Sequence, residues 1–590
     1  MGGNLSLPES HDTRYWREAF VCTLAAVIYS LAFLLSDSKL GVHDWELFTA
    51  MAEIPRVIVL KFGQFPFWNP YVGGGNILFH HPEVAILSPF FGLILIFGAV
   101  IGLKLQVLLC YFLGFWGSVR FARTLGMSES AGYLFGSIYF GSAFFALHFS
   151  EGHIPFTQFC FLPWVAYFWL KSLTRPRHTI YGALTLALMI LGNGAAAPFL
   201  YTSTFIGAFA ALLAFQQKSV RPLANMAALW LLGLGLAAVK FLPMFLHLQS
   251  HFWAGKPLDI VPFSALTDVF FSFDQGLFSH RNLGLAGGWH EYGAFIFFPA
   301  ILLALWYAVR DFSRSWIWLV LALFFFLHGL GGFAEWSPWR LLAHLPGFES
   351  SRAPGRSFQF VILAVGVLAG FGYDSLRAWI QSTSRSNLFR SPYWQSAPMI
   401  ILASIVTVNG WIAQQSLPQS FVREPVSSVW HADFKQTVGK PNIVYQSVLA
   451  NRGVILAPWL SAYEEGRGLV TADGSVLDEY INSGEAKILS RSYRGNEIHY
   501  GLEAATDGEI TLGMGYDDGW EVVTPANNNL RAEQGLLAVS FSAGDSELYL
   551  RYRTPYFYTG LLISLLSVVA LIVLGLRLKK SSCATLSESR

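Results

Sequence analysis

Charged residues are scarce in this chain of 590 residues, at 13% of the sequence against roughly 25% in a soluble domain. Hydrophobic residues make up 54% and aromatic residues 16%, and the mean hydropathy is +0.45. A soluble core cannot absorb this much apolar surface, so the composition excludes a soluble enzyme and a disordered chain. The sequence therefore predicts a polytopic membrane protein.

The chain also contains few cysteines and almost no excess of one charge over the other. The four cysteines lie far apart, three of them in apolar segments and Cys583 in the C-terminal tail, so the sequence offers neither a disulfide framework nor a CxxC metal site. The 39 basic and 37 acidic residues leave a net charge of +2. Without the concentrated basic face of a nucleic-acid binder, we expect no nucleic-acid partner.

The chain contains many long apolar runs. A span needs roughly 20 apolar residues, and we predict about twelve transmembrane helices. They cover residues 19–35, 103–122, 131–149, 156–172, 179–195, 199–215, 224–248, 292–309, 315–333, 357–375, 397–414 and 556–576. Residues 84–102 are also apolar, but Pro82 and Pro89 interrupt them. We predict a re-entrant or interfacial hairpin there, on the outer side, with a plain span as the alternative.

The flanking charges predict which side of the membrane each loop occupies, because Lys and Arg in short loops mark the cytoplasmic side. Arg14 and Arg17 precede the first run, and no cleavage site follows it. With that end in the cytoplasm, the later basic groups fall on the same side. They are Arg120 and Arg123; Lys171, Arg175 and Arg177; Lys218 and Arg221; Arg310 and Arg314; Arg377, Arg385 and Arg390; and Arg577, Lys579 and Lys580. The outer loops 150–155 and 196–198 contain no Lys or Arg. Both termini are therefore predicted to be cytoplasmic.

The long segments between the runs are then all predicted to lie outside: residues 36–102, 249–291, 334–356 and 415–555. In the last of these, short apolar or alternating stretches are punctuated by Gly, Asp and Asn, which is typical of strands. The stretches are Glu509–Met514, Gly519–Val523, Leu536–Phe541 and Leu548–Tyr552. We expect a transmembrane module over 1–414, an extracytoplasmic β-sandwich-like domain over 415–555, and a final transmembrane helix with a cytoplasmic tail over 556–590.

The first outer loop is the richest in polar groups. It opens with His43-Asp44-Trp45-Glu46, and Glu53 and Arg56 follow on an amphipathic helix. A carboxylate where a helix leaves the bilayer can deprotonate a hydroxyl as a general base, so Asp44 is the candidate catalytic residue. A helix-capping or solvated Asp is the alternative. A divalent cation is a further alternative, although the spacing of its potential ligands matches no ligand motif. These ligands would be Asp44, Glu46, His80, His81 and Glu83.

Three more polar groups lie at predicted outer span ends. Glu151-Gly152-His153 and Trp289-His290-Glu291-Tyr292 either line a cavity or form a solvated connection with an interfacial aromatic ring. Arg352 and Arg356 precede the span at 357–375, and Lys240 lies near the outer end of another. Since arginine suits bidentate phosphate contacts, we predict a phosphate clamp, with headgroup snorkelling as the alternative.

The order of these motifs resembles the YfhO-type bacterial membrane proteins, part of the wider GT-C class of polytopic glycosyltransferases. The matching pieces are His43-Asp44-Trp45-Glu46, Pro66-Phe67-Trp68-Asn69-Pro70-Tyr71 with its glycine turn, Glu151-Gly152-His153 before Leu162-Pro163-Trp164, Arg352-Ala353-Pro354-Gly355-Arg356, Tyr516-Asp517-Asp518-Gly519-Trp520, Ala538-Val539-Ser540-Phe541-Ser542-Ala543-Gly544, and Tyr552-Arg553-Thr554-Pro555-Tyr556-Phe557-Tyr558-Thr559-Gly560. The resemblance implies a GT-C fold in a bacterial inner membrane. It also implies sugar transfer outside the cytoplasm from a polyprenyl-phosphate-linked donor, with a first-loop acid as base. Some members of the class use a metal with Asp-x-Asp-like acids, whereas the second acid here is Glu46.

The hypothesis is a glycosyltransferase that moves a sugar to an extracytoplasmic glycan, lipid or protein. Its expected catalytic acids are Asp44 and Glu46, and its expected donor-phosphate ligands are Arg352, Arg356 and Lys240. Its expected substrate pocket contains His80, His81, Glu83, Glu151, His153, His290, Glu291 and Tyr292. The alternatives are a flippase for a lipid-linked saccharide and a non-catalytic cell-envelope assembly protein.

Overall fold

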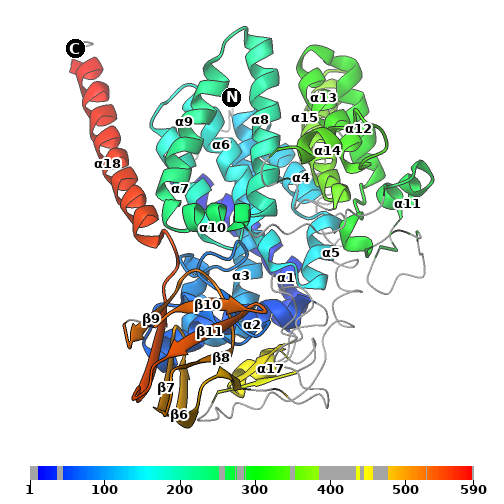
Figure 1. Cartoon of the computed structure of the whole chain (residues 1–590). Helices are drawn as coiled ribbons and strands as arrows, with labels where there is room; N and C mark the ends of the chain where they lie inside the picture. Colours follow the sequence, from blue (N-terminus) through cyan, green and yellow to red (C-terminus); the bar gives the residue numbers. More distant parts are fainter. Residues whose placement is uncertain are drawn as a thin grey trace.

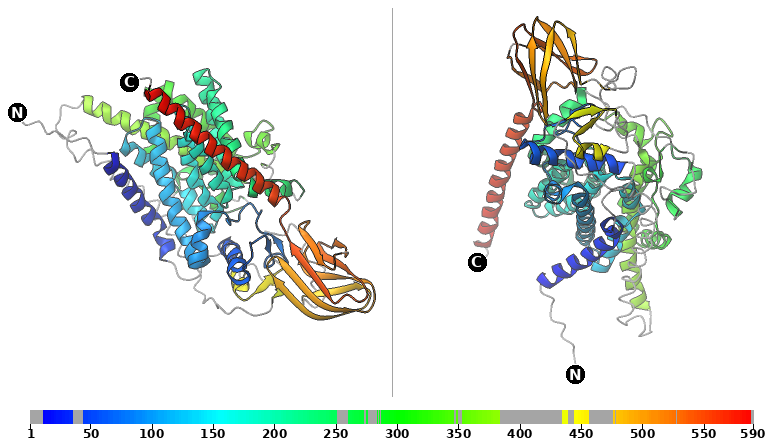
Figure 2. Two further views of the ribbon diagram at one scale, coloured as in Figure 1. Left: turned by 90° about the vertical axis from the view of Figure 1, so that its left-hand side faces the viewer. Right: turned by 90° about the horizontal axis from the view of Figure 1, so that it is seen from below.

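A bundle of helices and a β domain form the two main parts of the molecule (Figure 1). The computed structural model describes residues 11–35, 44–250, 260–272, 274–275, 283, 285, 287–345, 348, 353–383, 434–438, 444–455, 476, 478–526 and 528–587. Helix α1 (His11–Leu34) begins, and α18 (Phe557–Ser587) ends, at the end of the bundle away from the β domain (Figures 1 and 2).

The bundle holds most of the other helices. They are α2 (Asp44–Phe62), α3 (Pro89–Thr124), α4 (Glu129–Tyr139), α5 (Ala143–Glu151), the 3-10 helix η1 (Ile154–Phe161), α6 (Leu162–Ser172), α7 (His178–Leu191), α8 (Ala197–Gln217), α9 (Arg221–Leu236), α10 (Ala238–Ser250), α12 (Phe298–Arg310), α13 (Phe312–Gly329) and α15 (Phe358–Thr383). The shorter ones are η2 (Phe263–Ala265), α11 (Leu266–Phe271), η3 (Trp289–Glu291), α14 (Pro338–Ala343) and η5 (Pro354–Ser357).

This is a helical membrane protein, but twelve spans are not confirmed. Within the described ranges, six helices are long and apolar enough to cross a membrane, or seven if α9 and α10, bent by 91°, form one span. Residues 156–172 divide between η1 and α6 because Pro155 and Pro163 stand where each helix begins, and proline lacks the N–H that would continue the ladder. The run at 397–414 lies outside the described residues.

The segment at 84–102 contains a sharp break. Helix α3 reverses at Gly98, which has φ 82°, and a Cβ on Gly102 would lie 2.7 Å from the Cα of Ile94, so the two arms pack closely. The first arm, residues 89–97, is too short for a hydrocarbon core of about 30 Å at about 1.5 Å per residue. This geometry agrees with the predicted hairpin, and the candidate span begins at Ala99.

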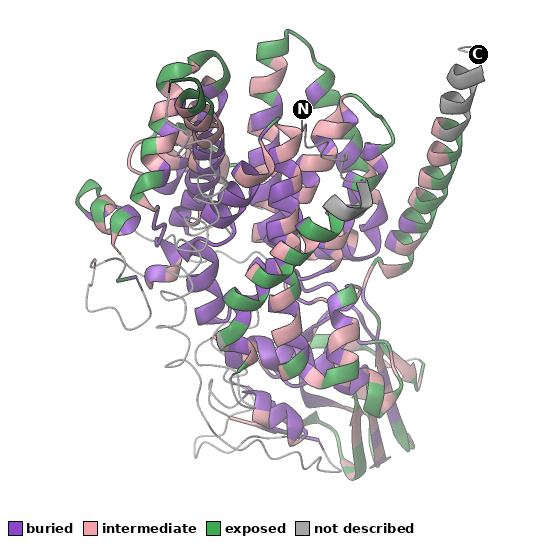
Figure 3. Cartoon of the chain, turned by 180° about the vertical axis from the view of Figure 1, so that it is seen from behind, coloured by how far each residue is buried: buried purple, intermediate pink, exposed green. Residues whose placement is uncertain are grey.

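Helix α18 stands at the edge of the bundle. Only 6% of its most apolar window is buried inside the protein (Figure 3), whereas 94% of the span Glu129–Glu151 is buried. Exposed side chains such as Leu562, Leu566 and Val569 form an apolar surface along it. Such a surface is stable in hydrocarbon and unfavourable in water, as expected of a lipid-facing helix.

The β domain consists of two four-stranded antiparallel sheets, so the predicted β-sheet region is confirmed. Their orders are β10-β11-β8-β5 and β6-β7-β12-β9. The strands are β5 (Glu479–Ser483), β6 (Ala486–Arg494), β7 (Glu497–Ala504), β8 (Gly508–Gly515), β9 (Trp520–Thr524), β10 (Leu530–Glu533), β11 (Leu536–Phe541) and β12 (Glu547–Tyr552). The hydroxyl of Tyr500 donates to Glu479 across the two sheets at 3.0 Å. Strands β8, β9, β11 and β12 match the four predicted from sequence.

The segment between α2 and α3 anchors the β domain to the bundle. The Oδ1 of Asn496 accepts hydrogen bonds from the backbone N–H groups of Phe67 and Trp68, at 3.1 and 3.0 Å. The ring of Trp68 also packs on Tyr552, with centroids 4.6 Å apart. Because this loop, with the short strands β1 (Trp68–Asn69) and β2 (Asn76–Ile77), holds both parts, the β domain has a defined position beside α2.

A second segment covers the same loop from the other side. It contains β3 (Lys435–Thr437), α17 (Val444–Leu449) and β4 (Arg452–Val454), with β3 and β4 paired in parallel. The hydroxyl of Tyr71 donates to Asn451 at 2.8 Å, and the N–H of Val454 donates to the carbonyl of Tyr71 at 2.8 Å. Figure 2 shows this segment, in yellow, beside α2.

Candidate functional site

The site is built around the start of α2, where Asp44 is the first helical residue. The indole Nε1 of Trp45 donates to the carbonyl of Phe149 at 2.9 Å, which fixes this end of α2 against α5. Gly152 ends α5 in the left-handed conformation, with φ 88°, and a Cβ there would lie 2.3 Å from the backbone N of Trp45. The loop that holds Glu151 and His153 can therefore reach Asp44 only with glycine at this position.

Replacing Gly152 with alanine is expected to displace that loop and to weaken the contact between His153 and Asp44. The matched control is Gly126→Ala, because Gly126 also has a positive φ, 100°, but a Cβ there meets nothing within 4 Å. The control carries only backbone strain, of about 1 kcal/mol. Melting temperatures of both variants in detergent test this: equal losses would contradict the role of the close approach.

Asp44 belongs to a chain of three side chains. The Nε2 of His153 lies 3.1 Å from Asp44 Oδ2, and the Nδ1 atoms of His153 and His148 lie 2.7 Å apart. Among the described residues, His153 is the one basic side chain within 4.0 Å of the Asp44 carboxylate, and the Asp44 side chain is 29% exposed. The ring of His148 stacks on Phe156 with centroids 3.9 Å apart. The carboxylate is thus held in place at one oxygen and remains accessible.

The electrostatics around these three side chains favour an ionised Asp44. Burial acts to raise its pKa, but the hydrogen bond from His153 and the positive charges of His290 and Arg356 outweigh burial and hold the pKa below the ordinary value. Burial lowers the pKa of His153, although Asp44 opposes this. We take His153 as the neutral imidazole that donates Nε2–H to the carboxylate, since the two ring nitrogens of a neutral histidine divide donor and acceptor roles.

A second group of charges lies beside the first. His290 Nδ1 is 3.3 Å from Glu151 Oε1, and its Nε2 is 3.6 Å from Glu291 Oε1. Glu291 in turn accepts two hydrogen bonds from Arg356, at 2.5 Å from Nε and 2.6 Å from Nη2. The guanidinium lies over the ring of Phe156, 5.1 Å from its centroid. Glu291 is 4% exposed, so this is a buried, bidentate ion pair.

Contacts between histidines join the two groups into one site. The rings of His153 and His290 meet edge to face with centroids 4.9 Å apart. Of the predicted site residues, the structure therefore brings together Asp44, Glu151, His153, His290, Glu291 and Arg356. Tyr292 packs against Gly355, whose Cβ would lie 3.1 Å from its ring. His148 was not among the residues predicted from the sequence; its position within the apolar run 131–149 was the available signal.

The protonation of His290 predicts a pH dependence. Burial opposes its charge, but hydrogen bonds to Glu151 and Glu291 raise its pKa to about 9. The folded protein thus holds this proton more tightly than the unfolded chain, and the resulting stability is complete below about pH 6.5 and lost as the pH rises through about 9. We expect the melting temperature to fall over this window in the wild type and to fall less in His290→Gln. If the melting temperature falls equally with pH in the wild type and in His290→Gln, the assignment of the raised pKa to His290 is contradicted.

A different group holds four of the predicted residues: His80, His81, Glu83 and Lys240. The Nζ of Lys240 donates to the carbonyls of Val84 and Gly192, at 2.5 and 2.6 Å. Burial and the charges of Lys240 and His247 lower the pKa of His81 to about 3. His80 meets His247 edge to face, and His247 lies 3.8 Å from Asp517 of the β domain. A cavity of about 20 Å³ lies beside this group and is lined among others by Glu83 and Ile154.

Glu46 and Arg352 are the two remaining predicted residues. Glu46 is buried and accepts the backbone N–H of Tyr445 at 2.9 Å, so it contacts the first turn of α17 instead of His153. Arg352 lies outside the described residues. Within the parts of the chain that the structure describes, no three His, Cys, Asp or Glu side chains form a group that could hold a metal ion. The divalent-cation alternative therefore gains no support from them.

Comparison with known proteins gives remote structural similarities. No family model matches the chain, and no curated protein matches it. The chain is similar to ArnT from Cupriavidus metallidurans in the apo state, with 14% identity and a TM-score of 0.42 over 75% of this chain and 86% of that one. For ArnT bound to undecaprenyl phosphate the TM-score is 0.41, with 14% identity over 89% and 98% of the chains. The arabinofuranosyltransferase AftD from Mycobacteria gives 0.37 and 16% identity over 70% of this chain, which spans 27% of that protein.

Proposed function

We propose that the protein is a membrane glycosyltransferase that moves a sugar from a polyprenyl-phosphate-linked donor to a hydroxyl acceptor. One observation carries the proposal: Asp44, partly exposed, is held by His153 within the group that also contains Glu291 and Arg356. A carboxylate held in this way has the geometry of a general base. The donor class and the extracytoplasmic location follow the family resemblance of the motifs.

In the proposed reaction, an acceptor hydroxyl attacks the anomeric carbon of the donor sugar. The new bond is carbon to acceptor oxygen, and the bond that breaks is carbon to phosphate oxygen. Asp44 takes the proton of the hydroxyl, and the electron pair leaves with the polyprenyl phosphate, which needs no strong acid. His153 and, behind it, His148 hold the carboxylate in line with the hydroxyl.

The donor phosphate would lie near Arg356, with the lipid tail in the bilayer. Glu291 uses two of the five N–H donors of the guanidinium, which leaves three for a phosphate. Arg352, which the sequence places close to Arg356, would add charge to the clamp, whereas Lys240 donates to the carbonyls of Val84 and Gly192 in the other group. A fixed cation stabilises the charge that develops on the leaving phosphate without reorganisation.

The experiment is to incubate the purified full-length protein with a panel of polyprenyl-phosphate sugars and acceptor glycans, and to measure the polyprenyl phosphate that is released. The proposal expects release from at least one donor, dependent on an acceptor. Transport of a lipid-linked saccharide into vesicles without any release would favour a flippase and contradict the proposal.

A further inference from the structure

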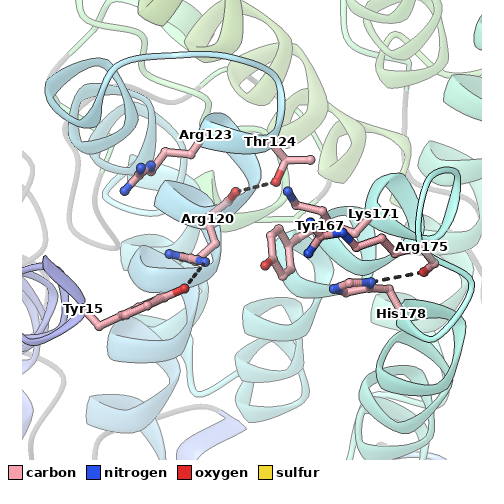
Figure 4. A pocket seen from close by; sticks show the side chains of 8 residues that line it. All are labelled: Tyr15, Arg120, Arg123, Thr124, Tyr167, Lys171, Arg175 and His178. Carbon is pink, nitrogen blue, oxygen red and sulfur yellow. Dashed lines mark hydrogen bonds between the residues drawn. The ribbon is translucent and has the colours of Figure 1, made fainter. Parts of the chain in front are cut away.

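A basic pocket lies at the opposite end of the bundle from the site. It has a volume of about 310 Å³ and is lined by Tyr15, Arg120, Arg123, Thr124, Tyr167, Lys171, Arg175 and His178. These residues come from α1, the last turns of α3, α6 with the turn that follows it, and the start of α7. Figure 4 shows Arg120 and Arg123 on the α3 side and Lys171, Arg175 and His178 on the other, with Tyr167 between them.

The α3 side of the pocket is held firmly. The buried Glu18 pairs with Arg120 at 3.2 Å and also with Arg123. The guanidinium of Arg120 lies over the rings of Tyr15 and Tyr167, 4.8 and 5.6 Å from their centroids. These contacts fix the direction of a cation that would otherwise move freely in solvent.

The other side of the pocket carries uncompensated charge. Within the described part of the chain, no carboxylate pairs with Lys171 or Arg175. Among the side chains that the structure describes, the four Lys and Arg residues of the pocket face one paired carboxylate, that of Glu18, which leaves these five groups with a net charge of +3. Retention of positive charge in the cytoplasm explains basic loops, but it requires neither a concave site nor aromatic rings that hold a guanidinium.

We propose that this pocket binds a phosphate group, such as that of an anionic lipid headgroup at the membrane surface. Arg120 and Arg123 present N–H groups suited to phosphate oxygens, and Lys171 and Arg175 supply the remaining charge. Basic pockets between transmembrane helices on the cytoplasmic side are suited to anionic headgroups. By the positive-inside rule, all four residues belong to the cytoplasmic side, away from Asp44.

The test measures binding to the purified full-length protein in a neutral detergent, with dihexanoyl phosphatidic acid, dihexanoyl phosphatidylcholine and inorganic phosphate as probes. The variant K171Q/R175Q keeps Glu18 and its partners. The control K218Q/R221Q removes the same charge from the exposed turn between α8 and α9. We expect saturable binding of phosphatidic acid, weakened roughly tenfold or more in K171Q/R175Q and less than about twofold in the control, because each basic residue near a lipid surface contributes about fivefold.

The outcomes separate the sources of phosphate. Binding of phosphatidic acid without binding of inorganic phosphate assigns the pocket to a lipid headgroup, and equal binding of both assigns it to phosphate in general. Either result supports the proposal if K171Q/R175Q weakens the binding and the control K218Q/R221Q does not. The variant K171R/R175K, which keeps the charge, is expected to retain most of the binding and shows that the pocket folds. Equal losses in the pocket variant and the control, or no saturable binding to the wild type, would overturn it.

Discussion

Replacing Asp44 with asparagine is expected to slow the release of polyprenyl phosphate by roughly 10²- to 10⁴-fold, the usual contribution of a general base. Asparagine has the same shape, and its side-chain oxygen can still accept the Nε2–H of His153, which lies 3.1 Å from the carboxylate. It cannot take a proton from the acceptor. The fold and the affinity for the donor should therefore change little while turnover is lost.

The matched control is Asp311→Asn, since Asp311 caps α13 by accepting the backbone N–H of Arg314, a role that asparagine also performs. Turnover and melting temperature are measured for both variants with the same donor. The assignment of Asp44 fails if D44N retains turnover close to that of the wild type, or if the two variants slow the reaction equally.

Replacing Arg356 with alanine is expected to destabilise the protein by about 3–5 kcal/mol, the usual result of leaving one charge of a buried pair without its partner. Here that charge is Glu291, whose carboxylate is 4% exposed and accepts both hydrogen bonds of the guanidinium. The free energy of unfolding in denaturant, measured in mild detergent, gives the loss. Donor use should fall as well, because Arg356 is the proposed phosphate ligand.

Two companion variants make this result specific. Arg340→Ala breaks an ion pair with Glu335 in which the side chains are 42% and 90% exposed, so its effect should stay below about 1 kcal/mol. The double variant R356M/E291M removes both buried charges and should recover much of the stability lost in R356A. Equal losses of stability in R356A and R340A would contradict a buried ion pair between Arg356 and Glu291.

The polar residues of the site could be selected from the sequence because charge is conspicuous within apolar surroundings. Asp44, Glu151, His153, Glu291 and Arg356 stand at the ends of apolar runs, where an ionisable group is expensive unless it has a partner. The same reasoning could not identify the partners. Arg356 pairs with Glu291, 65 positions earlier, and such a separation carries no local pattern.

Features that depend on contacts between residues far apart in the chain could not be predicted from the sequence either. The acid Glu46 resembled a second catalytic residue, but its carboxylate accepts the N–H of Tyr445, 399 positions later. The run at 224–248 was apolar throughout, yet it bends by 91° between α9 and α10. There Ser564 of α18 accepts the N–H of Val239 at 2.9 Å. In contrast, strands such as β8 and β11 follow alternation within a few residues, so the sequence predicted them directly.

The most direct test of the site is a double-mutant cycle between Asp44 and His153, with the rate of polyprenyl phosphate release as the readout. The proteins compared are the wild type, D44N, H153Q and D44N/H153Q. If the imidazole acts only by holding the carboxylate, H153Q should slow the wild type strongly and slow D44N by less than about twofold, since residues that act as one unit are not additive. Independent, multiplicative losses from the two substitutions would contradict the account.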